Sequence, residues 1–275
     1  MNIAETNHNT QSKRIKATEL ALWLLSRGIS SITTDEIAAL LAVPKNQVPQ
    51  RLMPLKKRGE IVSLARGLWV PVPPEFITWG APQAFDIIDA LMSYLNVDYY
   101  VGWLSASVLY GASHHAPQVF QVATSRAIRT KKIGRSVIHF YSRDHIHMVE
   151  IVKKESRNGV VLVSSRETTM LDIASDIEYV GGIDNVANLI IELCEASEPD
   201  IDVINTLSKH YPVSAVRRLG FLMERFTDVQ GLEQLKSNSD MRNTTASLLD
   251  PQSVNIGIVD KRWSLKINRE VSPDL

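Results

Sequence analysis

The chain has 275 residues, of which 44% are hydrophobic and 22% charged, and its formal net charge is zero. This length suggests two domains, and this composition is that of globular proteins, which excludes a disordered or fibrous chain. The single cysteine, Cys194, excludes an internal disulfide and any paired-cysteine metal or redox motif, which fits a reducing cytoplasm.

No targeting or membrane segment is predicted. The first residues are polar with no apolar segment behind them, and no apolar run approaches the roughly 18 residues of a membrane span. We therefore expect a cytoplasmic protein with no membrane contact. We also expect residues 1–12 to be flexible and the protein to be a monomer in solution.

Charge is segregated along the chain although the total is zero. The net charges are +5 for residues 1–70, −4 for 71–125, +6 for 126–157 and −7 for 158–275. Because charge acts locally, within a screening length of roughly 10 Å, two basic blocks indicate two surfaces that can meet phosphate. The alternative for each block is chance clustering on a solvated face.

Two helices are predicted at the start of the chain. Apolar residues recur at helical spacing over residues 15–25, and Gly28 follows where a left-handed cap would lie. Thr33 precedes Glu36 by three residues, which is the capping-box arrangement that begins a second helix.

A third, irregular helix follows the break at Pro44. Its inward residues are spaced at i, i+4 and i+7: Val48, Leu52 and Leu55. Pro49 suits only the first turn, and Pro54 removes a backbone hydrogen bond further in, so we expect a late start or a kink.

A hairpin completes the pattern, because two β-prone runs, residues 61–65 and 68–71, flank Arg66-Gly67. This order predicts a winged helix-turn-helix that binds DNA: a short helix, a tight break, a third helix and a hairpin. The alternative is a protein-binding module. The amides and cations expected to contact DNA are Lys45, Asn46, Gln47, Gln50, Arg51, Lys57, Arg58 and Arg66.

The proline-rich segment 70–74 predicts a domain boundary. We expect an α+β fold, with the winged helix in residues 1–74 and, in 75–275, a larger α/β domain whose mixed sheet is flanked by helices. The predicted strands are 119–123, 137–141, 148–152, 160–163 and 263–267. The predicted helices are 84–95, 105–110, one opened by Ser164 and Glu167, 183–196, 201–210 and 213–226.

A second basic block lies in the larger domain. Its members are Arg126, Arg129, Lys131, Lys132, Arg135, Lys153 and Lys154. The first five are expected in a turn between two strands, and the block is interpreted either as a surface for nucleic acid or a toxin, or as a solvated loop.

No catalytic residue, metal site or cofactor is predicted. Glu167 and Asp172 are five residues apart and do not share a helix face, which favours structural roles. No carboxylate or cysteine completes a convincing set of metal ligands with His139, His145 and His147. The pair His114-His115 is interpreted as a loop that ends a helix.

Further alternatives remain open from the residues alone, among them a protein-interaction module that sequesters a toxin and a nucleic-acid-processing enzyme. A nuclease would use Glu150 and Lys153, but their spacing does not place both side chains on one face of a strand. Arg217 and Arg218 either pack across their helix and pair with acids, or form a patch that faces a toxin or its substrate.

Several segments, in this order, resemble the AbiEi antitoxins. They are Leu52–Pro71, Gly102–Gly111 with a following His-Pro stretch, Glu167–Asp172 with Gly181-Gly182, Val216–Phe221, and Trp263–Asn268. The resemblance implies an antitoxin of a type IV (AbiE-like) toxin–antitoxin system that acts in abortive infection, a phage defence. It also implies repression of its own operon through operator DNA with inverted repeats. The implied partner is a nucleotidyltransferase-type toxin, AbiEii, which need not be contacted directly.

Overall fold

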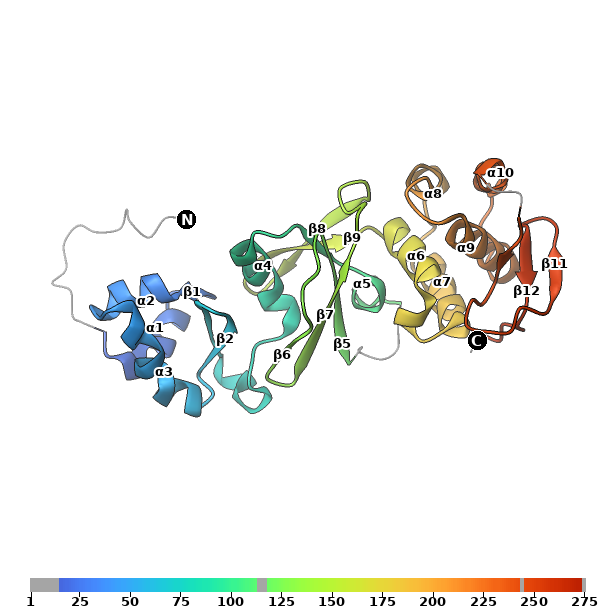
Figure 1. Cartoon of the computed structure of the whole chain (residues 1–275). Coiled ribbons are helices and arrows are strands. Elements are labelled where there is room, and N and C mark those ends of the chain that lie inside the picture. The colour runs from blue at the N-terminus through green and yellow to red at the C-terminus, as the bar shows by residue number, and fades with distance from the viewer. Residues whose placement is uncertain (1–14, 113–117, 243–244, 274–275) are drawn as a thin grey trace. The chain divides into compact units, whose positions relative to one another are not determined.

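The structure is a computed structural model that describes residues 15–112, 118–242 and 245–273. The expected flexible residues 1–12 and the His114-His115 loop lie outside these ranges. The chain divides into two compact units, drawn in Figure 1: residues to Tyr94 with Lys132–Arg135, and Leu95–Lys131 with residues from Ser136 onward. The first unit thus extends beyond residue 74, where the sequence places the domain boundary. No helix in the described ranges is long and apolar enough to cross a membrane.

The first unit consists of short helices and a three-stranded antiparallel sheet in the order β1-β3-β2. Its 3-10 helices are η2 (Ala17–Glu19), η3 (Lys45–Gln47) and η4 (Pro74–Trp79). Its α-helices are α1 (Leu20–Leu25), α2 (Thr34–Leu41), α3 (Val48–Lys57) and α4 (Ala84–Leu95), whose last residue is grouped with the second unit. Its strands are β1 (Ile32–Thr33), β2 (Ile61–Ala65) and β3 (Leu68–Pro71), and β6 (Lys131–Ile133) adjoins it.

Local sequence signals account for the helices of this unit. Thr33 and Glu36 form the predicted capping box, in which each side chain accepts from the other's backbone N–H. α3 begins only at Val48, after the 3-10 turn, and Pro54 lies inside it. The late start is therefore confirmed. The helices close over one apolar core, to which Leu20, Leu24, Ile37, Leu52 and Leu55 contribute.

A mixed sheet is the framework of the second unit. Its strands are β4 (Tyr99–Val101), β5 (Val119–Thr124), β7 (Ser136–Ser142), β8 (Ile151–Ser156) and β9 (Gly159–Ser164). With β6 at one edge the order is β6-β7-β5-β4-β9-β8, in which β5 pairs with β7 and β4 with β9 in parallel, and β4 pairs with β5 and β8 with β9 antiparallel. The expected fold class, α+β with a mixed sheet flanked by helices, is confirmed.

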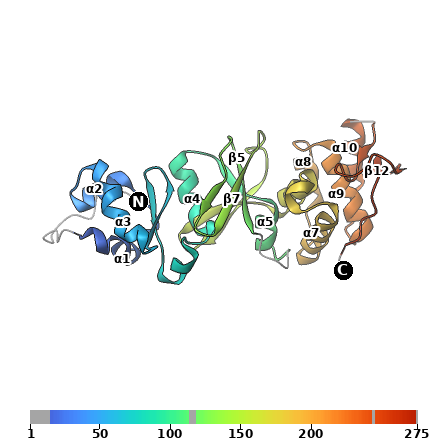
Figure 2. The ribbon, with the colours of Figure 1, turned by 60° about the horizontal axis from the view of Figure 1, so that its bottom comes forward.

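Helices and a small second sheet complete this unit. The helices are α5 (Trp103–Leu109), α6 (Arg166–Ser175), η5 (Ile177–Val180), α7 (Ile183–Ala196), α8 (Ile201–Ser208), α9 (Val213–Phe226) and α10 (Glu233–Arg242). Strands β10 (Ser247–Leu248), β12 (Leu265–Ile267) and β11 (Ile258–Asp260) form the small sheet in that order. In Figures 1 and 2, α9 lies between α7 and β12, both of which it contacts.

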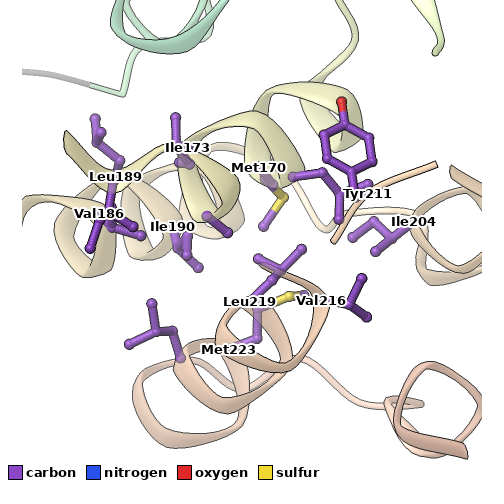
Figure 3. Close-up of a cluster of buried hydrophobic side chains, with 14 of the residues drawn as sticks. Met170, Ile173, Val186, Leu189, Ile190, Ile204, Tyr211, Val216, Leu219 and Met223 are labelled. Atoms are coloured by element: carbon purple, nitrogen blue, oxygen red, sulfur yellow. The ribbon is translucent and has the colours of Figure 1, made fainter. Parts of the chain in front are cut away.

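The largest core lies among α6, α7, α8 and α9. Figure 3 draws Met170 and Ile173 of α6, Val186 and Ile190 of α7 and Leu219 of α9 in one cluster, with Met170 and Ile190 directed toward Leu219. Each of these five side chains is 0% exposed, and burying one such side chain contributes about 1.5–3 kcal/mol. α9 is therefore the central helix of the unit.

Some predicted boundaries were wrong. α6 is capped by Ser165, whose Oγ accepts from Thr168 N at 3.1 Å, because Ser164 Oγ is already hydrogen-bonded to Thr169 at 2.6 Å. The strand expected at 148–152 runs from Ile151 to Ser156, and the last strand begins at Leu265 rather than Trp263. The expected basic turn after β5 contains a strand, β6.

Candidate nucleic-acid interface and a buried aspartate network

α3 separates its apolar and polar residues onto opposite sides. The inward residues are each 0% exposed: Val48, Leu52 and Leu55. At roughly 100° per residue, Gln50, Met53 and Lys57 lie on the opposite side, and all three are exposed. We call these three residues the α3 outer face. Arg51, next to Leu52, is exposed on the flank of the helix instead.

Acids of the same unit hold two of the predicted DNA-binding cations. Lys45 Nζ lies 2.7 Å from Asp35 Oδ2, and Arg58 Nε lies 2.6 Å from Glu60 Oε1. The hydrogen bond between Arg58 and Glu60 raises the pKa of the arginine and lowers the pKa of the carboxyl. Among the described residues, by contrast, the side chains of Arg51, Lys57 and Arg66 form no ion pair, so their charge is available to a ligand.

The turn between β2 and β3, Arg66-Gly67, is fixed from two sides, and we call it the wing turn. Tyr94 Oη donates to the carbonyl oxygen of Arg66 at 3.0 Å, and Thr34 N donates to the carbonyl oxygen of Gly67 at 2.8 Å. Gly67 has φ +94°, and a Cβ there would lie 2.5 Å from Tyr94 Oη. Only glycine therefore fits, and the exposed Arg66 side chain projects from a rigid turn.

The seven cations of the second basic block fall into three groups. Arg126, Arg129 and Lys131 follow β5, Lys132 and Arg135 belong to the first unit, and Lys153 and Lys154 lie on β8. Strands β4 and β9 separate β5 from β8 in the sheet order. The structure therefore does not gather this block onto one surface of the second unit.

Asp172 of α6 is the centre of a buried network in the second unit. Tyr100 Oη and Tyr211 Oη donate to its carboxylate at 3.0 and 2.9 Å, and Arg143 Nη2 lies 3.4 Å from it. Burial raises the pKa of Asp172 to about 6, although Arg143 and the tyrosine hydroxyls act in the opposite direction. The side chain is 0% exposed, so it does not meet a substrate in this conformation.

Trp103 packs against the guanidinium group of Arg143. Arg143 also pairs with Asp176, and its guanidinium carbon lies 5.0 Å from the ring centroid of Trp103. Trp103 Nε1 donates to Asp176 at 3.0 Å, and its ring meets Tyr141 edge-on at 4.8 Å. Trp103 has φ +49°, a backbone conformation that is rare for a bulky residue and that tertiary contacts must impose.

This network lies within a stretch of chain that matches a known family. Residues 100–225 match the model of the AbiEi antitoxin C-terminal domain. This stretch of the chain is similar to an AbiEi antitoxin domain. The resemblance noted in the sequence is thereby confirmed over these residues. The match supports a role as the antitoxin of a toxin–antitoxin system.

Other comparisons bear on the fold alone. The crystal structure of the RV2827C protein from Mycobacterium tuberculosis matches with a TM-score of 0.67 and 12% sequence identity, over 96% of this chain and 94% of that chain. No curated protein matches the chain.

Arg217 and Arg218 of α9 are buried, with 0% and 3% exposure. Arg217 donates to the carbonyl oxygens of Thr245 and Ser264 and to Ser247 Oγ, and Arg218 donates to the carbonyl oxygens of Ala174, Leu248 and Leu249. Burial lowers the pKa of Arg218 to about 10. Of the two alternatives left open for these arginines, the patch facing a toxin or its substrate is wrong, because the C-terminal segment covers them. They anchor that segment to α9.

The histidines and carboxylates considered for chemistry are dispersed. His147 Nε2 lies 3.6 Å from Asp98, the ring of His145 lies 5.0 Å from that of Tyr211, and His139 adjoins Tyr141. Within the described ranges, no three His, Cys, Asp or Glu side chains are grouped as metal ligands. Glu167 accepts from Asp200 N at 3.2 Å and has no contact with Asp172.

Proposed function

We propose that this chain is a cytoplasmic antitoxin of a type IV, AbiE-like system and that its first unit is a winged helix-turn-helix that represses its own operon. The observation that carries the DNA-binding half is the α3 outer face, which lies on a segment, residues 44–58, that contains no acidic residue. Its functional partner is a nucleotidyltransferase-type toxin, which the proposal does not require it to contact.

The topology of the first unit supports this proposal. Helix, strand, two helices and a hairpin follow one another, and Ala42, at φ +53°, makes the tight turn between α2 and α3. In helix-turn-helix proteins the second helix of the pair enters the major groove, which is the place of α3 here. All eight residues predicted to contact DNA are exposed.

A mobility-shift assay tests the DNA-binding half. The full chain is titrated onto the duplex upstream of its own operon and onto a shuffled duplex of equal length, at several salt concentrations. We expect preference for the upstream duplex and an affinity that falls steeply with salt, because phosphate contacts release counterions. Lys209→Ala, which changes an exposed lysine far along the chain, is the matched control. Equal binding to both duplexes at moderate salt would contradict the repressor role.

A second candidate, direct sequestration of the toxin, is favoured by an apolar surface on the small sheet. Val254, Ile256 and Ile258 are 67%, 77% and 83% exposed, and Ile258 lies on the edge strand β11. Exposed apolar patches mark protein interfaces. Size-exclusion chromatography of the co-expressed pair distinguishes the candidates. Sequestration requires a stoichiometric complex that the double variant Ile256→Ser/Ile258→Ser no longer forms. The type IV mechanism instead predicts that the antitoxin rescues growth without forming a complex.

A further inference from the structure

We infer that Met53 contacts the methyl group of a thymine in the major groove, so that the preferred DNA site carries an A·T base pair where the α3 outer face docks. The inference rests on the proposed DNA-binding function and adds a specificity determinant to it. Met53 is not among the amides and cations that the sequence pattern predicts to contact DNA.

The position of Met53 separates it from the core. Its side chain is 46% exposed, whereas Val48, Leu52 and Leu55, which hold α3 in place, are each 0% exposed. Met53 therefore faces outward on a helix whose packing other residues secure. Single exposed apolar residues are ordinary on protein surfaces, so the argument rests on its neighbours and not on exposure alone.

The neighbours of Met53 define what it meets. Gln50 precedes it by three residues and Lys57 follows it by four, and both lie on the same face. Pro54, beside it, is exposed and has no N–H to donate, so Met53 and Pro54 form an apolar strip between polar side chains. A ligand for this face must offer one apolar group surrounded by hydrogen-bonding groups and negative charge.

The major groove of DNA has this combination. The thymine 5-methyl is its one apolar group, adenine presents N7 and N6 to an amide such as Gln50, and phosphates border the groove. Three residues of helix advance roughly 4.5 Å, and successive base pairs are about 3.4 Å apart. Gln50 and Met53 therefore reach the same base pair or adjacent ones, and the flexible thioether of methionine adapts to the methyl group.

Replacement of thymine by deoxyuridine tests the inference, because it removes only the 5-methyl and leaves base pairing intact. The full-length protein is titrated onto its footprinted upstream duplex, with each thymine of the footprint replaced in turn. We expect about fourfold weaker binding at one or two positions, the effect of burying one methyl group. Elsewhere in the footprint the replacement should change the affinity little.

Variants of Met53 assign the effect to this side chain. Met53→Ala should bind the thymine duplex about fourfold more weakly and lose no further affinity with deoxyuridine, while Met53→Leu should keep the discrimination. The matched control is Leu22→Ala, which removes an apolar side chain that is 71% exposed on α1 and should retain full discrimination. Unchanged thermal unfolding of Met53→Ala would show that the fold is intact.

Two results would overturn the inference while leaving the repressor role in place. One is sequence-preferring binding that no deoxyuridine replacement weakens. The other is a Met53→Ala variant that discriminates as strongly as the parent protein. Failure of the parent protein to prefer its upstream duplex would instead remove the proposed function itself.

Discussion

The indole ring of Trp263 occupies the space that a side chain at Gly220 would need. A Cβ at Gly220 would lie 2.2 Å from two ring carbons of Trp263, which is itself 0% exposed. The indole Nε1 donates to Glu224 of α9 at 2.7 Å, which fixes the ring on the same helix. The absence of a side chain at Gly220 thus leaves the space on α9 into which Trp263 of the C-terminal segment packs.

Gly220→Ala should destabilise the protein by about 1–3 kcal/mol, because overpacking displaces the ring. This cost exceeds the gain of about 1 kcal/mol that alanine brings to a helix interior. Urea unfolding measures the difference. The double variant with Trp263→Leu should lose less than the sum of the single losses, and strict additivity would contradict the contact.

Arg218→Met should destabilise the protein by about 3 kcal/mol, because buried carbonyl oxygens, among them that of Leu249, lose their donor. Arg225→Met is the matched control, since Arg225 is an exposed arginine of the same helix. Equal urea midpoints for the two variants would show that the guanidinium anchors nothing.

Asp172 should make stability depend on pH in a defined window. Its folded pKa of about 6 exceeds the ordinary value of 3.8, so the folded state binds this proton more tightly than the unfolded chain. Its contribution is most favourable below about pH 4, declines by about 3 kcal/mol as the pH rises to about 6, and is constant above.

Asp172→Asn should remove this decline, because asparagine still accepts from the tyrosine hydroxyls and does not ionise. Urea unfolding of parent and variant from pH 4 to pH 7 measures the difference. Asp202→Asn, which replaces an exposed carboxylate, should show the same pH dependence of the free energy of unfolding as the parent protein. If Asp172→Asn also showed the parent's pH dependence, the titration would belong to another group.

Glu60→Gln should strengthen DNA binding, because it releases Arg58 from its ion pair to meet a phosphate. The salt slope of binding should steepen by about one unit. Glu198→Gln removes an equal charge from an exposed site in the second unit and controls for net charge. A similar gain with both variants would argue that only the total charge matters.

Gln50 and Arg66 should contribute differently to DNA binding, Gln50 by contacting bases and Arg66 by contacting phosphates. Gln50→Ala should cost about 1–3 kcal/mol on the preferred duplex and little on shuffled DNA, since amides pair with base edges. Arg66→Ala should weaken binding to every duplex alike and lower the salt slope by about one unit. Mobility shifts on both duplexes measure these losses of affinity. If Gln50→Ala weakened binding to both duplexes equally, base recognition would have to be assigned to another residue.

Structural features that depend on residues close together in the chain could be predicted from the sequence. The capping box of Thr33 and Glu36 and the inward spacing of Val48, Leu52 and Leu55 depend on positions within a few residues of one another, and the structure contains both. The glycine of the wing turn was also predictable as a turn residue. Its close approach to Tyr94 was not, because α4 lies beyond the hairpin in the chain.

Features that depend on distant partners were missed. Strand β4 has three residues and is defined by its neighbours β5 and β9, and β10 and β11 depend in the same way on β12. The burial of Arg217 and Arg218 depends on carbonyl acceptors from a segment that follows α9 in the chain. A pair of adjacent arginines has the same local pattern whether it faces solvent or carbonyl oxygens.

The anchoring of the C-terminal strands to α9 has a consequence for synthesis. Arg217 and Arg218 leave the ribosome before the carbonyls of residues 245–264 that they bind, and Trp263 is made 43 residues after Gly220. Until those residues emerge, two guanidinium groups lack most of their acceptors and the surface of α9 is uncovered. We therefore expect a message truncated before Trp263 to yield a second unit that does not fold stably.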